Sequence, residues 1–205
     1  MAVPLAQLVR PEHTALVTQE IQQGVVGEHS PLPELSAAAA RVGLIENVAL
    51  LLAAARRAGV RIVHCTAERR PDGLGANRNA RLFQYMARSE PKLLPGSEAA
   101  ALVPGIGARP DELVLTRLHG LSPFHGTELD WLLRNEGITT IVGVGVSVNV
   151  AIQNFAFDAV NAAYQMVIPT DGVAGFPADY VEQVFANTLS AIATLTTTAA
   201  LIDAW

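Results

Sequence analysis

Side chains that can do chemistry follow several short apolar runs of this chain. A carboxyl group, Glu20, comes after the first run, and a guanidinium, Arg117, comes after the third. The candidates are acids, amides, imidazoles, hydroxyls, one thiol and one guanidinium: Glu20, Gln22, His64, Cys65, Thr66, Arg117, His119, Ser122, His125, Ser147, Asn149, Thr170 and Asp171. A carboxylic acid can protonate a substrate, and a guanidinium can hold a carboxylate with two parallel hydrogen bonds. Glu20 and Arg117 therefore suit acid chemistry on a substrate that bears a carboxylate.

The apolar runs that precede these residues predict strands buried on both faces, as in a parallel sheet. They span residues 15–17, 60–63, 113–115, 141–144 and 166–168, with a brief sixth strand or a loop at Thr194–Thr197. Helical apolar spacing lies between and after them, at 44–55, 127–133, 148–159 and 181–192. Strand and helix in alternation predict an α/β fold, an open doubly wound parallel sheet of about six strands with helices on both faces.

In such a sheet, ligands bind beyond the carboxyl ends of the strands, where the strand order reverses. The candidate residues follow the strands and so belong to this edge. We expect one domain over residues 1–205. The irregular segment Glu68–Asp111, with one short helix near Asn79–Arg88, is typical of a lid, an interface arm or a binding loop. Its arginines form either a solvated face or an anion or subunit contact.

The composition limits the partners and the compartment. Half of the residues are apolar and the net charge is −5, which argues against nucleic acid or an anionic membrane surface as the main partner. No apolar run reaches the length of a membrane span, and Met1–Pro11 does not resemble a signal peptide. Cys65 is the only cysteine, so an internal disulfide is excluded. We expect a cytoplasmic protein that acts on a small molecule.

The sequence predicts no cofactor. Gly143-Val144-Gly145 follows the fourth strand and position 148 is Val, so it is not a dinucleotide fingerprint. Glu68 is the only acid close after the second strand, so this segment has no cluster of side chains that could bind a metal. We expect neither a nicotinamide cofactor nor a metal.

Four segments, in order, carry a resemblance to a known family. They are Thr14–Gln22, Leu115–Leu129 with its Ser122 and Phe124, Gly143–Ala159, and Asp171–Ala174. Together they resemble the isochorismatase-like (cysteine) hydrolase superfamily. The resemblance implies a Rossmann-like fold, a homo-oligomer and a cis peptide after the fourth strand, at Val146–Ser147.

The family's amide hydrolases carry an acid, a lysine and a nucleophilic cysteine, and the matching positions here are Glu20, Arg117 and Ala151. Alanine offers no nucleophile, so a thiol amidase at this position is excluded. The chain's one lysine, Lys92, lies in the irregular segment, and Cys65 follows a different strand. A lone cysteine is usually a small buried apolar residue, and its sequence neighbour His64 points to the opposite face of the strand.

The resemblance then implies the cysteine-free branch, in which the acid protonates the carbon of an enol ether and water attacks the resulting ion. Glu20 and Arg117 are the predicted catalytic residues. The predicted substrate-binding residues are Gln22, His119, Phe124, Val146, Ser147, Asn149 and Ala151. Alternatively, Glu20 and Arg117 form a buried ion pair that only fixes the shape of the site, and Asn149 only caps a helix.

The leading prediction is a hydrolase of a small carboxylate-bearing metabolite that uses general acid catalysis by Glu20. The alternative is a family member that has lost catalysis and serves as a binding or structural protein, because all three family positions are replaced. A catalytic Glu20 holds its proton near neutral pH, whereas an ion-paired Glu20 is ionised.

Overall fold

A computed structural model describes residues 3–205, which form a parallel sheet of seven strands. The strands are β1 (Thr14–Gln19), β2 (Arg61–Ala67), β3 (Leu113–Arg117), β4 (Thr140–Val146), β5 (Gln165–Pro169), β6 (Val173–Ala174) and β7 (Thr194–Thr196). Their order is β3-β2-β1-β4-β5-β7, with β6 paired to the end of β4. The chain moves outward from β1 to β3, returns to β4 beside β1, and then builds the other half. The switch point therefore lies between β1 and β4.

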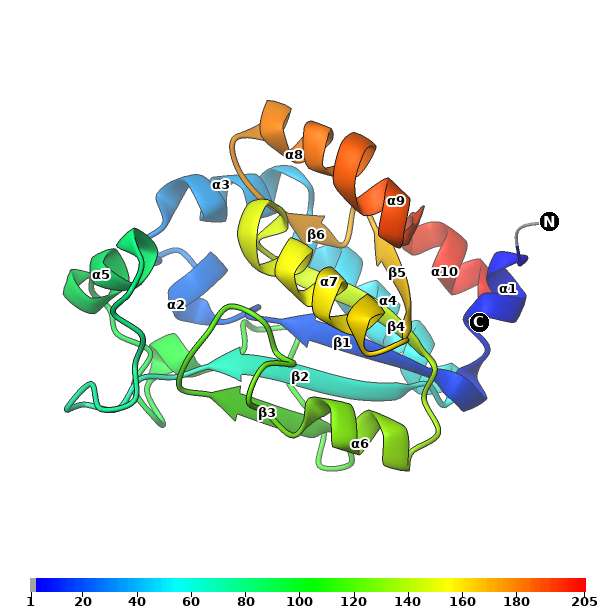
Figure 1. Ribbon diagram of the computed structural model, residues 1–205, viewed down its shortest axis with the longest axis horizontal. Coiled ribbons are helices and arrows are strands. Elements are labelled where there is room, and N and C mark those ends of the chain that lie inside the picture. The colour runs from blue at the N-terminus through cyan, green and yellow to red at the C-terminus, as the bar shows by residue number, and fades with distance from the viewer. Residues whose placement is uncertain (1–2) are drawn as a thin grey trace.

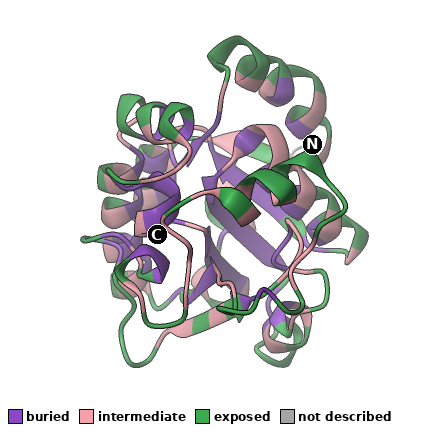
Figure 2. Ribbon diagram, turned by 90° about the vertical axis from the view of Figure 1, so that its left-hand side faces the viewer, coloured by how far each residue is buried: buried purple, intermediate pink, exposed green. Residues whose placement is uncertain are grey.

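Neighbouring residues of a strand point to opposite faces of the sheet, and each face carries its own apolar cluster. Leu16 packs in one cluster with Leu51 and Leu52 of α4, whereas Val17 packs in the other with Phe155 of α7. Both clusters contain fully buried side chains, and the strands run through the interior between them (Figure 2). This two-sided burial explains why the strand sequences are continuously apolar.

Helices cover both faces of the sheet (Figure 1). Their bounds are α1 (Leu5–Leu8), α2 (Gln23–Val26), α3 (Pro33–Arg41), α4 (Leu44–Ala58), α5 (Arg81–Arg88), α6 (Leu129–Asn135), α7 (Gln153–Asn161), α8 (Ala178–Val184), α9 (Ser190–Ile192) and α10 (Thr198–Ala204). Short 3₁₀ turns occupy Pro11–His13 and Glu98–Ala100, and π-helical turns occupy Val148–Ile152 and Phe185–Leu189. Among the described residues no single helix is long and apolar enough to cross a membrane, although α3 and α4, bent by 58°, meet that test jointly.

The predicted α/β class is confirmed, and each of the six predicted strands is present. The expected end of the helix at Gly59 is also seen: this residue has φ +78°, the left-handed conformation that glycine adopts readily. The structure adds the two-residue strand β6 and helices outside the predicted ranges, among them α3 and α10. The segment Glu68–Asp111 contains α5 and crosses the carboxyl edge of the sheet, where the strand arrows end in Figure 1.

Candidate functional site

Glu20 is the first residue beyond β1 and has an unusual backbone. Its φ is +53°, a conformation that non-glycine residues seldom adopt and that costs on the order of 1–3 kcal/mol. The Glu20 N–H donates to the carbonyl oxygen of Cys65 at 2.9 Å, which fixes the turn against the end of β2. Such strain persists where the surrounding structure imposes it, and it occurs often at active sites. The turn directs Glu20 toward the edge of the sheet rather than into the core.

Arg117 ends β3 and reaches across the end of β2 to Glu20. Its Nη2 donates to Oε1 of Glu20, in a charge-assisted contact, and lies 3.4 Å from the carbonyl oxygen of Leu121. The side chain of Arg117 is 3% exposed and that of Glu20 is 19% exposed. The Nε and Nη1 atoms of Arg117 are buried and have no hydrogen-bond partner within residues 3–205. Buried donors without partners are rare, so this guanidinium is incompletely satisfied.

A cavity of about 170 Å³ opens on this pair. One wall consists of residues at the strand ends: Glu20, Ala67, Glu68, Arg117, Leu118 and His119. The opposite wall comes from the irregular segment and the helices beside it, and it includes Asn77, Leu82, Phe83, Met86, Lys92 and Leu93. The segment Glu68–Asp111 therefore forms part of the cavity.

Lys92 is the main addition to the predicted site. Its position in the irregular segment did not indicate a site residue, yet Lys92 lies in the cavity wall with Glu20 and Arg117. Its Nζ contacts Oε1 of Glu90, so the ammonium group already has an anionic partner. The apolar spacing of Leu82, Phe83 and Met86 within the predicted helix was the available signal for the opposite wall.

Gln22 and Phe124, two of the predicted substrate ligands, have other partners. The Gln22 side chain donates to the carbonyl oxygens of Ala67 and Ala100 at 2.9 and 2.7 Å and accepts from the Ala67 N–H at 2.8 Å. Both of its N–H donors are thereby occupied. The Phe124 ring lies 5.8 Å from that of Phe155 and packs with the apolar cluster over α7. His119, in contrast, lines the cavity.

The remaining predicted ligands follow β4, which pairs with β1 at the switch point. The peptide between Val146 and Ser147 is cis, as the family resemblance implied. The side-chain oxygen of Asn149 accepts from the N–H of Phe176 at 3.3 Å, so it links the helical turn after β4 to the loop before α8 instead of capping the helix. Ala151 is 6% exposed. These residues lie beside the end of β1 but are not part of the cavity wall around Arg117.

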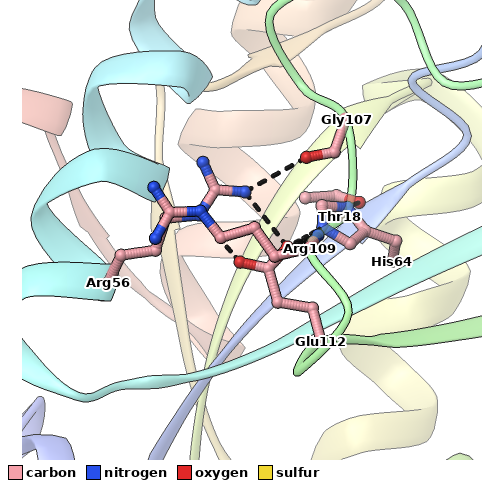
Figure 3. A network of polar contacts seen from close by, with 6 residues as sticks. All are labelled: Thr18, Arg56, His64, Gly107, Arg109 and Glu112. Atoms are coloured by element: carbon pink, nitrogen blue, oxygen red, sulfur yellow. Dashed lines mark hydrogen bonds and ion pairs between the residues drawn. The ribbon is translucent and has the colours of Figure 1, made fainter.

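Cys65 and His64 lie side by side on β2 and have separate environments. Cys65 is 2% exposed, and its burial raises the pKa of the thiol to about 12, although Arg117 nearby opposes this effect. At neutral pH the thiol keeps its proton and is a poor nucleophile. His64 lies 3.0 Å from the hydroxyl of Thr18 and 3.2 Å from a carboxylate oxygen of Glu112 (Figure 3).

The described residues contain no group of three or more His, Cys, Asp or Glu side chains that could hold a metal ion. The charged side chains of the cavity wall are Glu20, Glu68, Arg69, Lys92 and Arg117. Arg117 provides a delocalised cation with fixed donor geometry, and Glu20 provides an acid or base next to it.

The fold and the cavity define an α/β protein with a candidate ligand site at the carboxyl edge of its sheet. The chain belongs to the isochorismatase family, because the Isochorismatase domain matches residues 14–200. It is 35% identical over 77 residues to the uncharacterized isochorismatase family protein YwoC of Bacillus subtilis (strain 168), covering 38% of this chain. It is 30% identical over 148 residues to the ureidoacrylate amidohydrolase RutB of Methylorubrum extorquens, covering 66% of this chain.

The match spans 40% of the length of the first relative and 59% of the second. Among solved structures, a cysteine hydrolase from Pseudomonas syringae pv. phaseolicola 1448A superposes with a TM-score of 0.85. Its sequence is 24% identical, and the superposition covers 100% of this chain and 98% of that chain. At this identity the likeness establishes the fold.

Proposed function

We propose that this protein hydrolyses a small metabolite that bears a carboxylate, with Arg117 binding the carboxylate and Glu20 acting as the acid. The observation that carries the proposal is the incompletely satisfied guanidinium of Arg117 beside an ionisable Glu20 at one cavity. A buried guanidinium with spare donors is a strong ligand for a carboxylate, because charge-assisted hydrogen bonds of this kind are short and strong. Ureidoacrylate, which appears in the name of one relative, is itself a carboxylate.

The ion pair between Glu20 and Arg117 describes the site before substrate arrives. A substrate carboxylate competes for the Nη2 donor that Glu20 now holds. Once displaced, Glu20 lies beside a second negative charge, which favours its protonated form. In this proposal Glu20 is an acid only when substrate is present, and the two interpretations of the pair describe successive states of the site.

The reaction that needs no nucleophile on the protein is enol-ether hydrolysis. Glu20 donates its proton to the enol-ether carbon, and water attacks the oxocarbenium ion that results. The hemiketal then breaks down to pyruvate and an alcohol. Residue 151 is alanine and the Cys65 thiol is protonated at neutral pH, and both facts favour water as the nucleophile.

A second candidate reaction is the hydrolysis of an amide that bears a carboxylate, favoured by the relative named as a ureidoacrylate amidohydrolase. The carboxylate would bind Arg117 in the same way. Glu20 would then transfer protons between water and the leaving nitrogen. The two reactions share the binding mode and differ in the bond that is cleaved.

The test is hydrolysis of isochorismate, followed by pyruvate release, and of ureidoacrylate, followed by its consumption. Both are measured with the wild type and with Glu20→Gln, which preserves the size of the side chain. Hydrolysis of either compound that is lost in Glu20→Gln supports the proposal. Hydrolysis that survives in Glu20→Gln contradicts the role of Glu20. Failure to hydrolyse either compound would favour a family member that binds without catalysis.

A further inference from the structure

The helix α5 presents an apolar face to the cavity, and the side chains of this face belong to neither of the two apolar clusters of the core. None of residues 81–88 is buried, yet Leu82, Phe83 and Met86 all line the cavity. The helix is anchored by the Tyr85 hydroxyl, which donates to the carbonyl oxygen of Pro31 at 2.8 Å. An apolar helix face that lines a cavity and is half covered has unburied surface available to a ligand.

Further apolar side chains continue this wall. Val25 follows β1 in α2, Leu32 precedes α3, and Leu93 follows α5, and all three line the same cavity. The backbone N–H of Arg69 donates to the carbonyl oxygen of Leu93 at 2.7 Å, which joins the start of the segment to its return past α5. The cavity thus has a polar end at Glu20 and Arg117 and an apolar wall facing it.

The size of the cavity limits what this wall can contact. A volume of about 170 Å³ is close to that of a cavity of roughly 150 Å³ that is known to take up benzene in another protein. One compact group of about the size of a six-membered ring fills it. A bare two-carbon acid leaves the apolar wall uncovered.

We propose that the substrates of this site are carboxylates with a compact apolar body of about ring size. The carboxylate binds Arg117, and the body packs against Leu82, Phe83 and Met86. Arg69 and Lys92 also line the cavity, but Arg117 is the proposed anchor because two of its buried nitrogens have no partner in the described chain. This inference rests on the proposed function, because it assumes that Arg117 is the carboxylate anchor.

Equilibrium binding tests the inference with three probes: benzoate, acetate and benzyl alcohol. Benzoate has both the carboxylate and the ring, and each of the others has one of them. We expect benzoate to bind at least about tenfold more tightly than acetate, because its ring leaves water on binding. Phe83→Ala should weaken benzoate binding roughly five- to tenfold and leave acetate binding unchanged. Met86→Ala is a second variant of the same wall, and Gln84→Ala, an exposed site on the same helix, is the matched control.

The inference is overturned if acetate binds as tightly as benzoate, or if neither Phe83→Ala nor Met86→Ala weakens benzoate binding. Arg117→Met separates it from the proposed function. If that substitution leaves benzoate binding intact while Phe83→Ala weakens it, the anchor is wrong and the apolar wall stands. If Arg117→Met weakens benzoate and acetate alike while the wall variants have no effect, the anchor stands and the inference fails. Thermal unfolding of each variant shows that it is folded.

Discussion

The two ends of β3 each place an arginine beside a glutamate, and the two pairs differ in how completely they are satisfied. At the amino end, Arg56 binds both carboxylate oxygens of Glu112, at 2.7 and 3.0 Å. Glu112 also accepts from the N–H of Arg109 at 2.8 Å and lies 3.2 Å from His64 (Figure 3). At the carboxyl end, Arg117 contacts Glu20 through one nitrogen, and two of its nitrogens have no partner in the described chain.

The difference follows from position in an α/β sheet. The amino ends of the strands carry no ligand, so a polar cluster there lasts only if its members satisfy one another. At the carboxyl edge the partner of a buried charge can be a ligand, and the protein alone leaves the group short of partners. The comparison indicates that the closed pair, Arg56 and Glu112, serves stability, and under the proposed function the open pair, Arg117 and Glu20, serves binding.

The largest expected effect comes from Glu112→Ala. Its side chain is 5% exposed, and its removal leaves Arg56 and His64 without their anionic partner. We expect a loss of about 3–5 kcal/mol in the free energy of unfolding, measured by urea denaturation. Glu136→Ala removes the partner of Arg61 from a pair whose side chains are both 44% exposed, and should cost less than about 1 kcal/mol. Equal losses in the two variants would contradict the comparison.

The closed pair also predicts loss of stability in acid. Burial alone would raise the pKa of Glu112, but the hydrogen bonds from Arg56, from the Arg109 N–H and from His64 outweigh it and hold the pKa at about 2. The unfolded chain binds this proton near pH 4.5, so the stabilisation is complete above that pH and is lost as the pH falls toward 2. The loss is on the order of 3 kcal/mol.

The burial of His64 also makes the folded protein less stable as the pH falls, over a higher pH range than Glu112 does. Burial lowers its pKa, although the hydrogen bond to Glu112 opposes this effect, so the folded protein holds His64 neutral. Its contribution is present above the ordinary histidine pKa of about 6.5 and is lost as the pH falls below it. Urea denaturation at a series of pH values measures both losses. Glu112→Gln should flatten the part between pH 4.5 and 2, and an unchanged profile would show that another group dominates.

A smaller effect is expected when the open pair is replaced as a whole. The double variant Glu20→Gln with Arg117→Met removes both charges and keeps similar volumes. Replacing a buried ion pair with neutral groups is often neutral or stabilising, so the free energy of unfolding should change by less than about 1 kcal/mol. Benzoate binding should be lost. A destabilisation as large as that of Glu112→Ala would mean that the open pair is structural.

The smallest effect on binding and hydrolysis is expected at Cys65. Because the thiol is 2% exposed and its pKa is raised to about 12, native protein should not react with iodoacetamide at neutral pH. Cys65→Ala should cost about 1 kcal/mol of stability and leave hydrolysis unchanged. Rapid alkylation that stops hydrolysis would instead identify Cys65 as a nucleophile.

The sequence was sufficient to predict the sheet and the residues that meet at its carboxyl edge. Continuous β-branched runs predicted the strands because both faces of a parallel sheet are buried, and the edge rule brought Glu20, Arg117 and His119 to one cavity. For the far wall the sequence offered only the apolar spacing of Leu82, Phe83 and Met86, which does not show what these side chains face. Lys92 and Phe83 take their places through contacts distant in sequence, such as that of Arg69 with Leu93, and no local pattern encodes those contacts.

The two arginine–glutamate pairs could not have been distinguished from residue types. Both combine the same side chains, and only their partners in space separate them. His64 shows the same limit, because its position on β2 predicted the direction of its side chain but not the contact with Glu112. The tertiary arrangement of the loops before and after the strands determines which polar groups become hydrogen-bond partners.

The most direct test of the account is the protonation state of Glu20 with and without a bound carboxylate. It can be followed at neutral pH through the side-chain carboxyl carbon in ¹³C NMR, with Glu20→Gln used to assign the signal. We predict that the Glu20 signal is that of a carboxylate in the free protein and moves to the position of a protonated carboxyl group as benzoate is added. A Glu20 signal that remains that of a carboxylate at saturating benzoate would contradict the exchange between Glu20 and substrate on Arg117.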